Sequence, residues 1–401
     1  MDLPIVIVGA GAAGLLAAIF AAGRGRRVVL LERTKDGGRK ILISGGGRCN
    51  ILPSELDPSR YVTASSPATM RNILRSWPLD GQRRFFEEEL GLTLVLEPET
   101  GKLFPATNRA RDVRDGLVSL ARRRGAEVRF DSKVTDVTRA GDAWRVQVEG
   151  GEALDAAAVI LTTGGLSVPA TGSDGIGLAI ARRLGHTVNE TYPALTPLTA
   201  DPPVHAPLAG ISPVVTIEAP GQRFRTTGGF LFTHRGYSGP SVLDISHLAV
   251  RSRLRGEHQP VVVQWTDLDT AAWEAIFSRG GTGTVANVVR RHLPERLANA
   301  LLAEAGVPDD RTLSHLGRDE RKRLVTLLAR YPLPWTGDEG YRKAEVTGGG
   351  VALGEIDPRT MESRLHPGLY LAGEILDAFG PIGGYNFVWA WVTGRAAGSA
   401  V

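Results

Sequence analysis

The chain has 401 residues, of which 42% are hydrophobic and 49 are glycine, as is typical of a folded α/β protein of two or three domains. Its formal charge of +4 is small for this length, and the basic residues are spread out, so composition does not favour nucleic acid as a partner. The single cysteine, Cys49, excludes an internal disulfide, a cysteine-based metal cluster and a redox-active dithiol, and we predict no metal site.

The first 32 residues carry the first motif. Residues 5–8 form a β-branched apolar run, residues 15–22 are rich in alanine, and residues 28–31 form a second apolar run that ends in Glu32. Between the first two segments lies the pattern Gly9, Gly11, Gly14. This order predicts a strand, glycine turn, helix, strand and acid, which is a βαβ unit with the dinucleotide-binding fingerprint.

Each position of this fingerprint has a physical reason. Gly9 permits the tight turn, Gly11 lets the backbone approach a pyrophosphate, and Gly14 lets the helix pack close to the strand. The helix N-terminus offers N–H groups to the phosphates, and Glu32 can accept hydrogen bonds from ribose hydroxyls. A signal peptide or membrane helix is the alternative, because residues 3–23 carry no charge. The basic n-region of a signal is missing, so we expect a cytoplasmic protein without a membrane segment.

A second glycine-rich stretch follows at residues 33–50. The cations Arg39, Lys40 and Arg48 flank Ser44 and the glycines after it. Such a loop can wrap an anion or lie against a flat ring, although an ordinary flexible loop is the alternative. Cys49 lies in this stretch and has two interpretations, a thiolate beside a bound cofactor or a small buried residue, and we favour the second.

The segment GRKILISGGGRCN, behind a GxGxxG turn and an acid, resembles the aminoacetone-oxidase-like family of bacterial FAD-binding proteins, which also contains a flavin-dependent bile-acid reductase. The resemblance extends over nearly the whole chain. It includes the spacing from Gly164 to Gly177, the loop at residues 229–240, the segment at residues 355–363 and the segment at residues 368–386. In the family a Thr-Asn pair usually follows the position of Asn50, whereas this chain has Ile51-Leu52-Pro53 there.

Between these motifs we expect helices at residues 70–77, 82–90 and 113–124. A β-meander is expected around a turn at residues 141–142, and a buried strand should end in Thr163-Gly164-Gly165. The turn at residues 101–105 either contacts the substrate or flavin rim or is purely structural, and we favour the structural role. From residue 190 the sequence predicts short strands separated by prolines, and over residues 270–331 it predicts helices.

The C-terminal segment returns to the first domain. A buried strand ends in Gly373-Glu374, followed by Asp377, and in the superfamily an acid at such a strand end bonds the ribitol chain. A glycine turn through Gly383 and Gly384 opens an apolar helix. The N–H groups of residues 382–385 should meet the pyrimidine edge of the flavin, where the helix dipole favours negative charge.

The predicted fold is therefore α/β: a Rossmann-like FAD-binding domain with a β-meander, interrupted by an inserted β-rich domain and a helical cap. The expected boundaries are 1–190 with 345–401, 191–269, and 270–344. The fingerprint and the resemblance together predict FAD contacts from Gly9, Gly11, Ala13, Gly14, Glu32, Arg33, Arg39, Lys40, Ser44, Gly45, Gly46, Arg48, Asn50, Val134, Thr163, Gly164, Gly165, Gly373, Glu374, Asp377, Ile382, Gly383, Gly384, Tyr385 and Asn386.

The predicted activity is hydride transfer between non-covalently bound FAD and a small organic substrate. Since no second glycine fingerprint is present, either NAD(P)H binds transiently over the flavin or oxygen reoxidises it. The candidate catalytic residues are His234 and Tyr237, in a glycine-bounded loop, and Tyr385. For His234, a local backbone bond is the alternative. Two other functions stay open: an FAD-dependent RNA-modifying enzyme and a flavin-binding protein without turnover.

Overall fold

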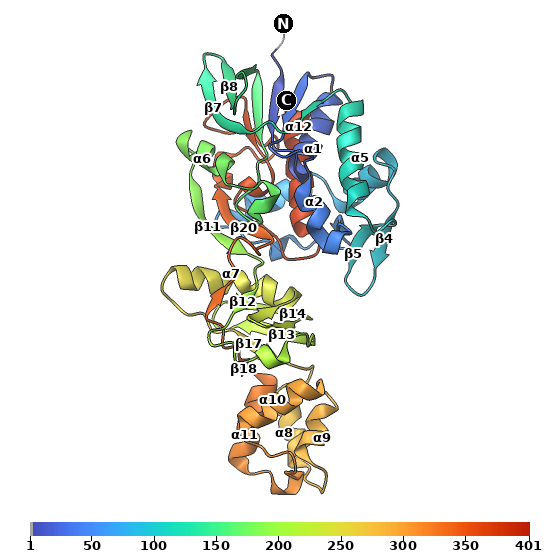
Figure 1. Cartoon of the computed structure of the whole chain (residues 1–401), viewed down its shortest axis with the longest axis vertical. Helices are drawn as coiled ribbons and strands as arrows, with labels where there is room; N and C mark the ends of the chain where they lie inside the picture. The colour runs from blue at the N-terminus through green and yellow to red at the C-terminus, as the bar shows by residue number, and fades with distance from the viewer. Residues whose placement is uncertain (1–2) are drawn as a thin grey trace. The chain divides into compact units, whose positions relative to one another are not determined.

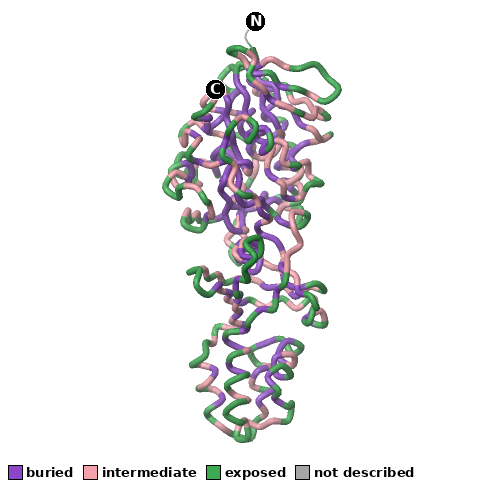
Figure 2. The backbone as a smooth tube through the Cα atoms, turned by 90° about the vertical axis from the view of Figure 1, so that its left-hand side faces the viewer, coloured by how far each residue is buried: buried purple, intermediate pink, exposed green. Residues whose placement is uncertain are grey.

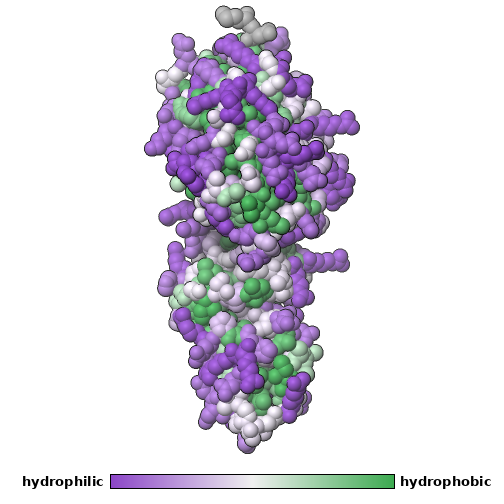
Figure 3. Space-filling view, turned by 90° about the vertical axis from the view of Figure 1, so that its right-hand side faces the viewer, coloured by the Kyte–Doolittle hydropathy of each residue, from purple (hydrophilic) through white to green (hydrophobic). Residues whose placement is uncertain are grey.

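The computed structural model describes residues 3–401, which divide into two compact units (Figure 1). The first unit comprises residues 1–192 and 345–401, and the second comprises residues 193–344. These limits lie close to the expected boundaries of an interrupted FAD-binding domain. Buried segments run through the interior of each unit (Figure 2), and on the face drawn in Figure 3 hydrophilic residues surround small hydrophobic patches.

A five-stranded parallel sheet forms the centre of the first unit. Its order is β21 (Leu369–Leu371), β10 (Ala158–Leu161), β1 (Ile5–Val8), β2 (Val28–Leu31) and β6 (Glu127–Arg129). The strands β1, β2, β10 and β21 are buried along their whole length, which explains their continuous apolar sequences. The Rossmann-like α/β prediction is confirmed.

Two helices of the first unit approach each other closely because of small residues. Helix α1 (Ala12–Ala22) packs against α12 (Tyr385–Ala400). A Cβ added at Gly394 would lie 2.3 Å from the carbonyl oxygen of Ala13, and one at Gly398 would lie 2.3 Å from that of Ala17. Because both contacts advance by four residues in the same direction, α1 and α12 run parallel.

Further elements surround the sheet. Helix α5 (Ala110–Arg123) packs on α1, and β8 (Ala143–Val148) of the meander contacts β10. The meander also includes β7 (Val134–Ala140) and β9 (Leu154–Ala156). A small sheet pairs β3 (Leu52–Pro53), β5 (Lys102–Pro105) and β4 (Leu94–Glu97). The remaining elements are α2 (Arg39–Ile43), α3 (Pro67–Arg75), α4 (Leu79–Arg84), α6 (Ile176–Arg183), β11 (Val188–Ala194) and β20 (Val346–Val351).

The second unit contains two antiparallel sheets. One joins β15 (Leu231–Thr233), β16 (Gly236–Ser238), β12 (Leu198–Thr199) and β19 (Gly337–Asp338). The other joins β14 (Phe224–Gly229), β13 (Val214–Ala219), β17 (Val262–Gln264) and β18 (Tyr331–Pro332). The strands β18 and β19 lie in the range expected to be a helical cap.

The helices of the second unit are α7 (Pro240–Leu254), α8 (Thr270–Ser278), α9 (Val285–Arg290), α10 (Glu295–Ala305) and α11 (Arg318–Ala329). Their buried side chains share one hydrophobic core with the strands. The expected division at residue 270 therefore separates neither two cores nor strands from helices, because α7 precedes it and β18 and β19 follow it. Helix α7 was not predicted, although Pro240 at its first position is a recognised start signal. Among residues 3–401, no helix combines the length and apolar character needed to cross a membrane.

A buried histidine in the second unit should make its stability depend on pH. His247 lies on α7, where its Nδ1–H donates to the Asp244 carbonyl oxygen at 2.9 Å. Burial lowers the pKa of His247 to about 4, and the charge of Arg251 acts in the same direction. The unfolded chain, with a histidine pKa of about 6.5, therefore binds the proton more strongly than the folded chain does. The stabilisation is complete above pH 6.5 and is lost as the pH falls towards 4.

Because one pKa unit corresponds to about 1.4 kcal/mol, we expect a loss of about 2–3 kcal/mol between pH 7 and pH 4.5. Hydrogen exchange of α7 peptides, followed by mass spectrometry at several pH values, measures this loss locally. The His247→Gln variant has no titrating group there and should show a shallower dependence. Equal slopes in the two chains would contradict the assignment.

Candidate FAD-binding site

The predicted FAD contacts from distant parts of the chain converge at one edge of the parallel sheet. Gly9 follows β1, Glu32 follows β2, Thr163 follows β10, and Gly373 follows β21. These strands are parallel and in register, so their carboxyl ends lie at the same edge, where ligands bind in open α/β sheets. The structure thereby brings together four segments that are up to 364 residues apart.

The turn before α1 has room for a phosphate. Gly9 has a φ of 101°, and a Cβ there would lie 2.7 Å from the carbonyl oxygen of Thr162. A Cβ on Gly14 would lie 1.9 Å from the carbonyl oxygen of Gly9, whereas one on Gly11 would meet no atom within 4 Å. Helix α1 has no side-chain cap and no acidic residue in its first turn. The carboxylate of Glu32 bonds the N–H of Ala10, but the N–H groups of the first turn of α1 carry no side-chain cap, so they suit a pyrophosphate.

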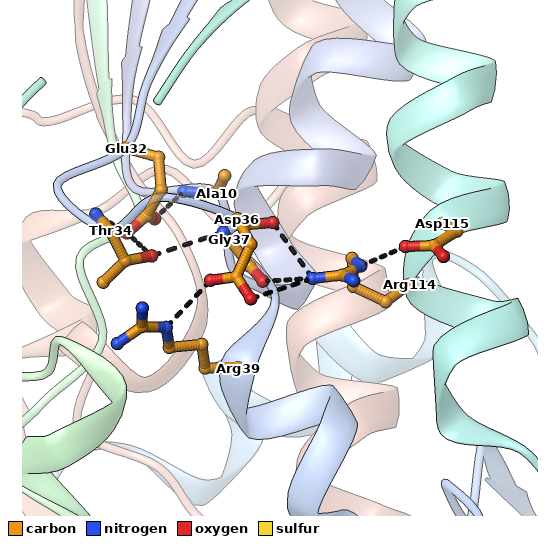
Figure 4. Close-up of polar contacts among 8 residues, drawn as sticks. All are labelled: Ala10, Glu32, Thr34, Asp36, Gly37, Arg39, Arg114 and Asp115. Atoms are coloured by element: carbon orange, nitrogen blue, oxygen red, sulfur yellow. Dashed lines mark hydrogen bonds and ion pairs between the residues drawn. The ribbon is translucent and has the colours of Figure 1, made fainter. Parts of the chain in front are cut away.

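Glu32 braces this turn from β2. Its Oε2 accepts a hydrogen bond from the Ala10 N–H at 2.8 Å, and its Oε1 accepts from the N–H and hydroxyl of Thr34 at 2.8 and 2.7 Å (Figure 4). An ionised carboxylate has about four acceptor positions. The observed bonds leave one acceptor position of Glu32 for a ribose hydroxyl, so the predicted contact with the ribose stays possible. The sequence did not indicate the second role of Glu32, which is to hold the turn before α1.

A buried arginine that the sequence pattern did not indicate holds the next part of the loop. Arg114 of α5 donates from Nη1 to the carbonyl oxygens of Asp36 and Gly37 at 3.1 and 3.2 Å, and it also pairs with Asp115 (Figure 4). Burial alone would raise the pKa of Asp36, but Arg39 and Arg114 hold it below its usual value. The sequence did contain a signal for this role, because Arg114 lies beside Val113 and Leu117 on the apolar face of a predicted helix.

The cations of residues 33–50 are mostly engaged with the protein. Arg33 pairs with Asp174, and Arg39 pairs with Asp36 at 2.9 Å. The Arg48 guanidinium lies 2.9 Å from a Glu97 oxygen and 4.0 Å from the centre of the Phe104 ring. Arg48 therefore bridges two strands of the small sheet, and its contact with a cofactor stays a prediction.

Of the glycines in this loop, Gly46 faces open space, whereas Gly45 is closely packed. The 3₁₀ segment at residues 44–47 is interrupted by a kink, where Gly45 and Gly46 have left-handed φ values of 55° and 67°. A Cβ at Gly46 would meet no atom within 4 Å, whereas one at Gly45 would lie 3.0 Å from the backbone nitrogen of Asn50 and 3.0 Å from the Phe104 ring. Ser44 donates to the Ile41 carbonyl oxygen at 2.8 Å. There is therefore room for a flat ring to lie against Gly46, and this contact stays a prediction.

Cys49 is a buried neutral thiol. Its side chain is fully buried, and burial raises its pKa to about 12 although Ser44 forms a hydrogen bond with it. A thiolate at neutral pH is incompatible with this environment. The structure thus supports the small buried residue and contradicts the alternative of a thiolate beside the cofactor.

A polar network crosses the ends of three strands. Lys40 Nζ lies 2.5 Å from Glu374 Oε2 and 2.5 Å from Ser167 Oγ, and Ser167 donates to Glu374 Oε1 at 2.5 Å. Thr347 on β20 donates from its backbone N–H to Glu374 at 3.0 Å. The side chains of Lys40 and Glu374 remain partly exposed, so this network is accessible to a ligand. The sequence predicted Lys40 and Glu374 as separate contacts and did not predict their pairing.

Three further residues can offer only their backbone to a cofactor. Thr163 turns its buried hydroxyl toward α6, where a Cβ at Gly177 would lie 2.0 Å from it. Val134 is buried at the start of β7. The Ala13 side chain is buried, and a Cβ at Gly373 would lie 2.9 Å from it.

The glycines at 164 and 165 follow β10, and a Cβ at Gly165 would lie 2.4 Å from the Thr347 hydroxyl.

Asp377 is turned into the protein. Only 2% of the residue is exposed, and its Oδ2 accepts hydrogen bonds from Ser65 Oγ and Asn189 Nδ2 at 2.7 Å and from the Ala64 N–H at 3.1 Å. The side chain thus links two segments of the first unit. We correct the predicted cofactor contact to a structural one, because the carboxylate is occupied by these donors.

The entrance of α12 is built from glycines. Gly383 and Gly384 have φ values of 112° and 98°, and a Cβ at Gly384 would lie 2.8 Å from the carbonyl carbon of Leu52. The Asn386 side chain bonds the N–H and carbonyl of Gly380, both at 2.9 Å, and so closes the loop that contains Ile382. Asn386 therefore shapes this turn. Helix α12 has no side-chain cap and no acid in its first turn.

The candidate catalytic residues have different surroundings. His234 is exposed at the tip of the β15–β16 hairpin. Tyr237 is fully buried, its hydroxyl lies 2.9 Å from His205 Nδ1, and burial raises its pKa. Tyr237 is thus part of the core, and its prediction as a catalytic residue was wrong. The Tyr385 hydroxyl lies 3.4 Å from the Glu55 carbonyl oxygen and the Asp57 N–H, so its role stays a prediction.

A serine–histidine–glutamate chain in the first unit is structural. His186 lies 2.9 Å from Glu355 through Nδ1 and 2.9 Å from Ser363 Oγ through Nε2. Ser363 Oγ also accepts the N–H groups of Leu365 and His366 at 3.1 and 3.0 Å. Because its hydrogen-bonding capacity is used and it is buried, this serine is not an accessible nucleophile.

Comparison with known proteins shows the family of this chain. The family described as HI0933-like protein Rossmann domain matches residues 3–400. The chain belongs to this family. It is 35% identical over 392 residues to the ribosomal RNA dihydrouridine synthase of Escherichia coli, covering 96% of this chain and 94% of the relative. It is 31% identical over 406 residues to the 3-dehydro-bile acid delta(4,6)-reductase of Clostridium scindens, covering 99% and 98%.

Among solved structures, the 3-ketosteroid-delta4-(5alpha)-dehydrogenase of Rhodococcus jostii matches with a TM-score of 0.52 and 15% identity, covering 100% of this chain and 96% of that chain. This likeness shows the fold. The expected FAD-binding oxidoreductase family is confirmed at this level. The aminoacetone-oxidase part of the resemblance stays a prediction.

Proposed function

We propose that the protein is an FAD-dependent reductase of C=C bonds conjugated to a carbonyl group. The names of two relatives support this reaction class. Dihydrouridine is uridine with its ring C=C bond reduced beside a carbonyl, and a 3-dehydro bile acid with delta(4,6) unsaturation carries C=C bonds conjugated to its ketone. Both reactions add a hydride and a proton to an electron-poor alkene.

Bound FAD would supply the hydride, and the chain would supply position and charge. The N-terminus of α1 and the open space at Gly11 suit the pyrophosphate, and Glu32 suits the ribose. The network of Lys40, Ser167 and Glu374 offers polar groups at the strand ends. We propose Tyr385 of the first unit as a candidate proton donor to the substrate carbon, and the exposed His234 of the second unit stays a separate candidate.

The test follows the colour of the bound flavin without oxygen. The holoprotein is reduced with NADPH or NADH and mixed with cyclohex-2-enone or a 4-en-3-one steroid, with cyclohexanone and cyclohexene as controls. We expect the conjugated alkenes to restore the oxidised spectrum and to give products heavier by two hydrogens. Reoxidation by oxygen alone, with reduction of the flavin by an alcohol or amine, would instead identify an oxidase.

A uridine in ribosomal RNA is the second candidate substrate. The observation in its favour is the 35% identity, over nearly the whole chain, to a relative named for that reaction. The small net charge of +4 supports a small molecule instead, which remains our first proposal together with NAD(P)H as electron donor. Anaerobic reoxidation by unmodified ribosomal RNA, with dihydrouridine detected in the digested product, would identify RNA as the substrate.

A further inference from the structure

The parallel packing of α1 and α12 places two helix N-termini in a row. Gly394 contacts Ala13 in the first turn of α1, and it lies nine residues after Tyr385, where α12 begins. Nine residues of α-helix rise about 13 Å. Since the helices run in the same direction and Ala13 is the second residue of α1, the start of α12 lies eight residues, or about 12 Å, beyond the start of α1. The N-terminus of α1 and the N-terminus of α12 are therefore separate positions along one helix pair, available to different parts of one elongated ligand.

A lysine stands at this second N-terminus. A Cβ added at Gly383 would lie 3.3 Å from Lys102 Cε and 3.9 Å from its Cγ. Lys102 belongs to β5, where it pairs with Pro53 of β3, and Leu52, the residue before Pro53, lies under Gly384. Leu52 and Pro53 have no side-chain hydrogen-bond donor. Beside the N-terminus of α12, Lys102 is therefore the residue of this small sheet that can offer one.

Lys102 has no carboxylate of its own. Glu97 lies opposite it across β4 and β5 and attracts it, but the Glu97 side chain bonds to Arg48 at 2.9 Å and to Thr100 at 2.6 Å. Within residues 3–401 no acidic group lies within ion-pair distance of Lys102. A cation beside an uncapped helix N-terminus is unfavourable by itself, because both are positive. The arrangement is stabilised when a negatively charged or electron-rich group lies between them.

We propose that Lys102 is the residue that sets the reduction potential of the bound flavin by facing its pyrimidine edge together with the N-terminus of α12. This inference rests on the proposed function. The pyrimidine edge gains negative charge when FAD is reduced, so a nearby cation stabilises the reduced form more than the oxidised form. Lys102 therefore makes FAD easier to reduce, and it acts on the cofactor rather than on the substrate.

The experiment measures the midpoint potential of FAD in the holoprotein with a reference dye under anaerobic conditions. Lys102→Met removes the charge and keeps a side chain of similar length. We expect reduced FAD to lose about tenfold in affinity relative to oxidised FAD, which corresponds to a potential about 30 mV more negative for two electrons. Lys102→Arg keeps the charge and should stay near the potential of the unaltered protein.

Lys322→Met is the matched control, because this exposed lysine lies on α11 of the second unit; we expect no shift. Lys102→Gln is a second neutral variant in case Lys102→Met does not fold. An unchanged potential in a flavin-loaded neutral variant, or an equal shift in Lys322→Met, would overturn the proposal. The measurement needs no substrate. A shifted potential without turnover of conjugated alkenes would contradict the proposed function and leave the role of Lys102 intact.

Discussion

Replacing Gly11 by alanine should weaken FAD binding about a hundredfold and leave the apoprotein folded. A Cβ at this position meets no protein atom within 4 Å, so the fold has room for it. The same Cβ would occupy the space through which the pyrophosphate approaches the backbone of the turn. A hundredfold weaker affinity corresponds to about 3 kcal/mol, and fluorescence titration of the apoprotein with FAD measures it.

Two other glycines provide the comparison. Gly14→Ala places a Cβ 1.9 Å from the Gly9 carbonyl oxygen and 2.5 Å from the Thr162 hydroxyl, so this variant should lose stability even without FAD. Gly283→Ala introduces the same methyl group into open space on the second unit and should change neither property. Unchanged FAD affinity in Gly11→Ala would show that the pyrophosphate does not approach this turn.

Asp377→Ala should destabilise the first unit by about 3–5 kcal/mol. The carboxylate is buried, and its loss leaves the donors of Ala64, Ser65 and Asn189 without their acceptor. Each unsatisfied buried donor costs about 1–3 kcal/mol, and these costs are not independent. Urea unfolding of the apoprotein measures the loss. Asp377→Asn keeps one acceptor oxygen and should lose less.

Glu374 is the informative comparison because it lies three residues earlier and is more exposed. Glu374→Gln preserves the shape of the side chain but removes the charge that Lys40 contacts at 2.5 Å. Its main effect should be on FAD affinity, with a smaller loss of stability. If Asp377→Ala instead retained full stability and lost FAD affinity, Asp377 would regain its predicted place at the cofactor.

The sequence was sufficient for the fold class because its elements carry strong local signals. The apolar runs at β1 and β10, the glycine spacing from Gly9 to Gly14 and the apolar helix after Gly384 are local features, and each appears in the structure. The inserted unit was less predictable. Helix α7 and the strands β18 and β19 are short or weakly patterned, and their formation depends on the shared core of that unit.

For the site, the sequence named the positions and the tertiary structure decided what each side chain does. Local pattern gave Gly9, Gly11 and Glu32 their places at strand ends, because turn geometry is encoded within a few residues. It could not separate Glu374 from Asp377, reveal Arg114, or show that Tyr237 is buried. These roles depend on partners tens to hundreds of residues away, and only packing determines which charge has a counterion and which, as for Lys102, has none.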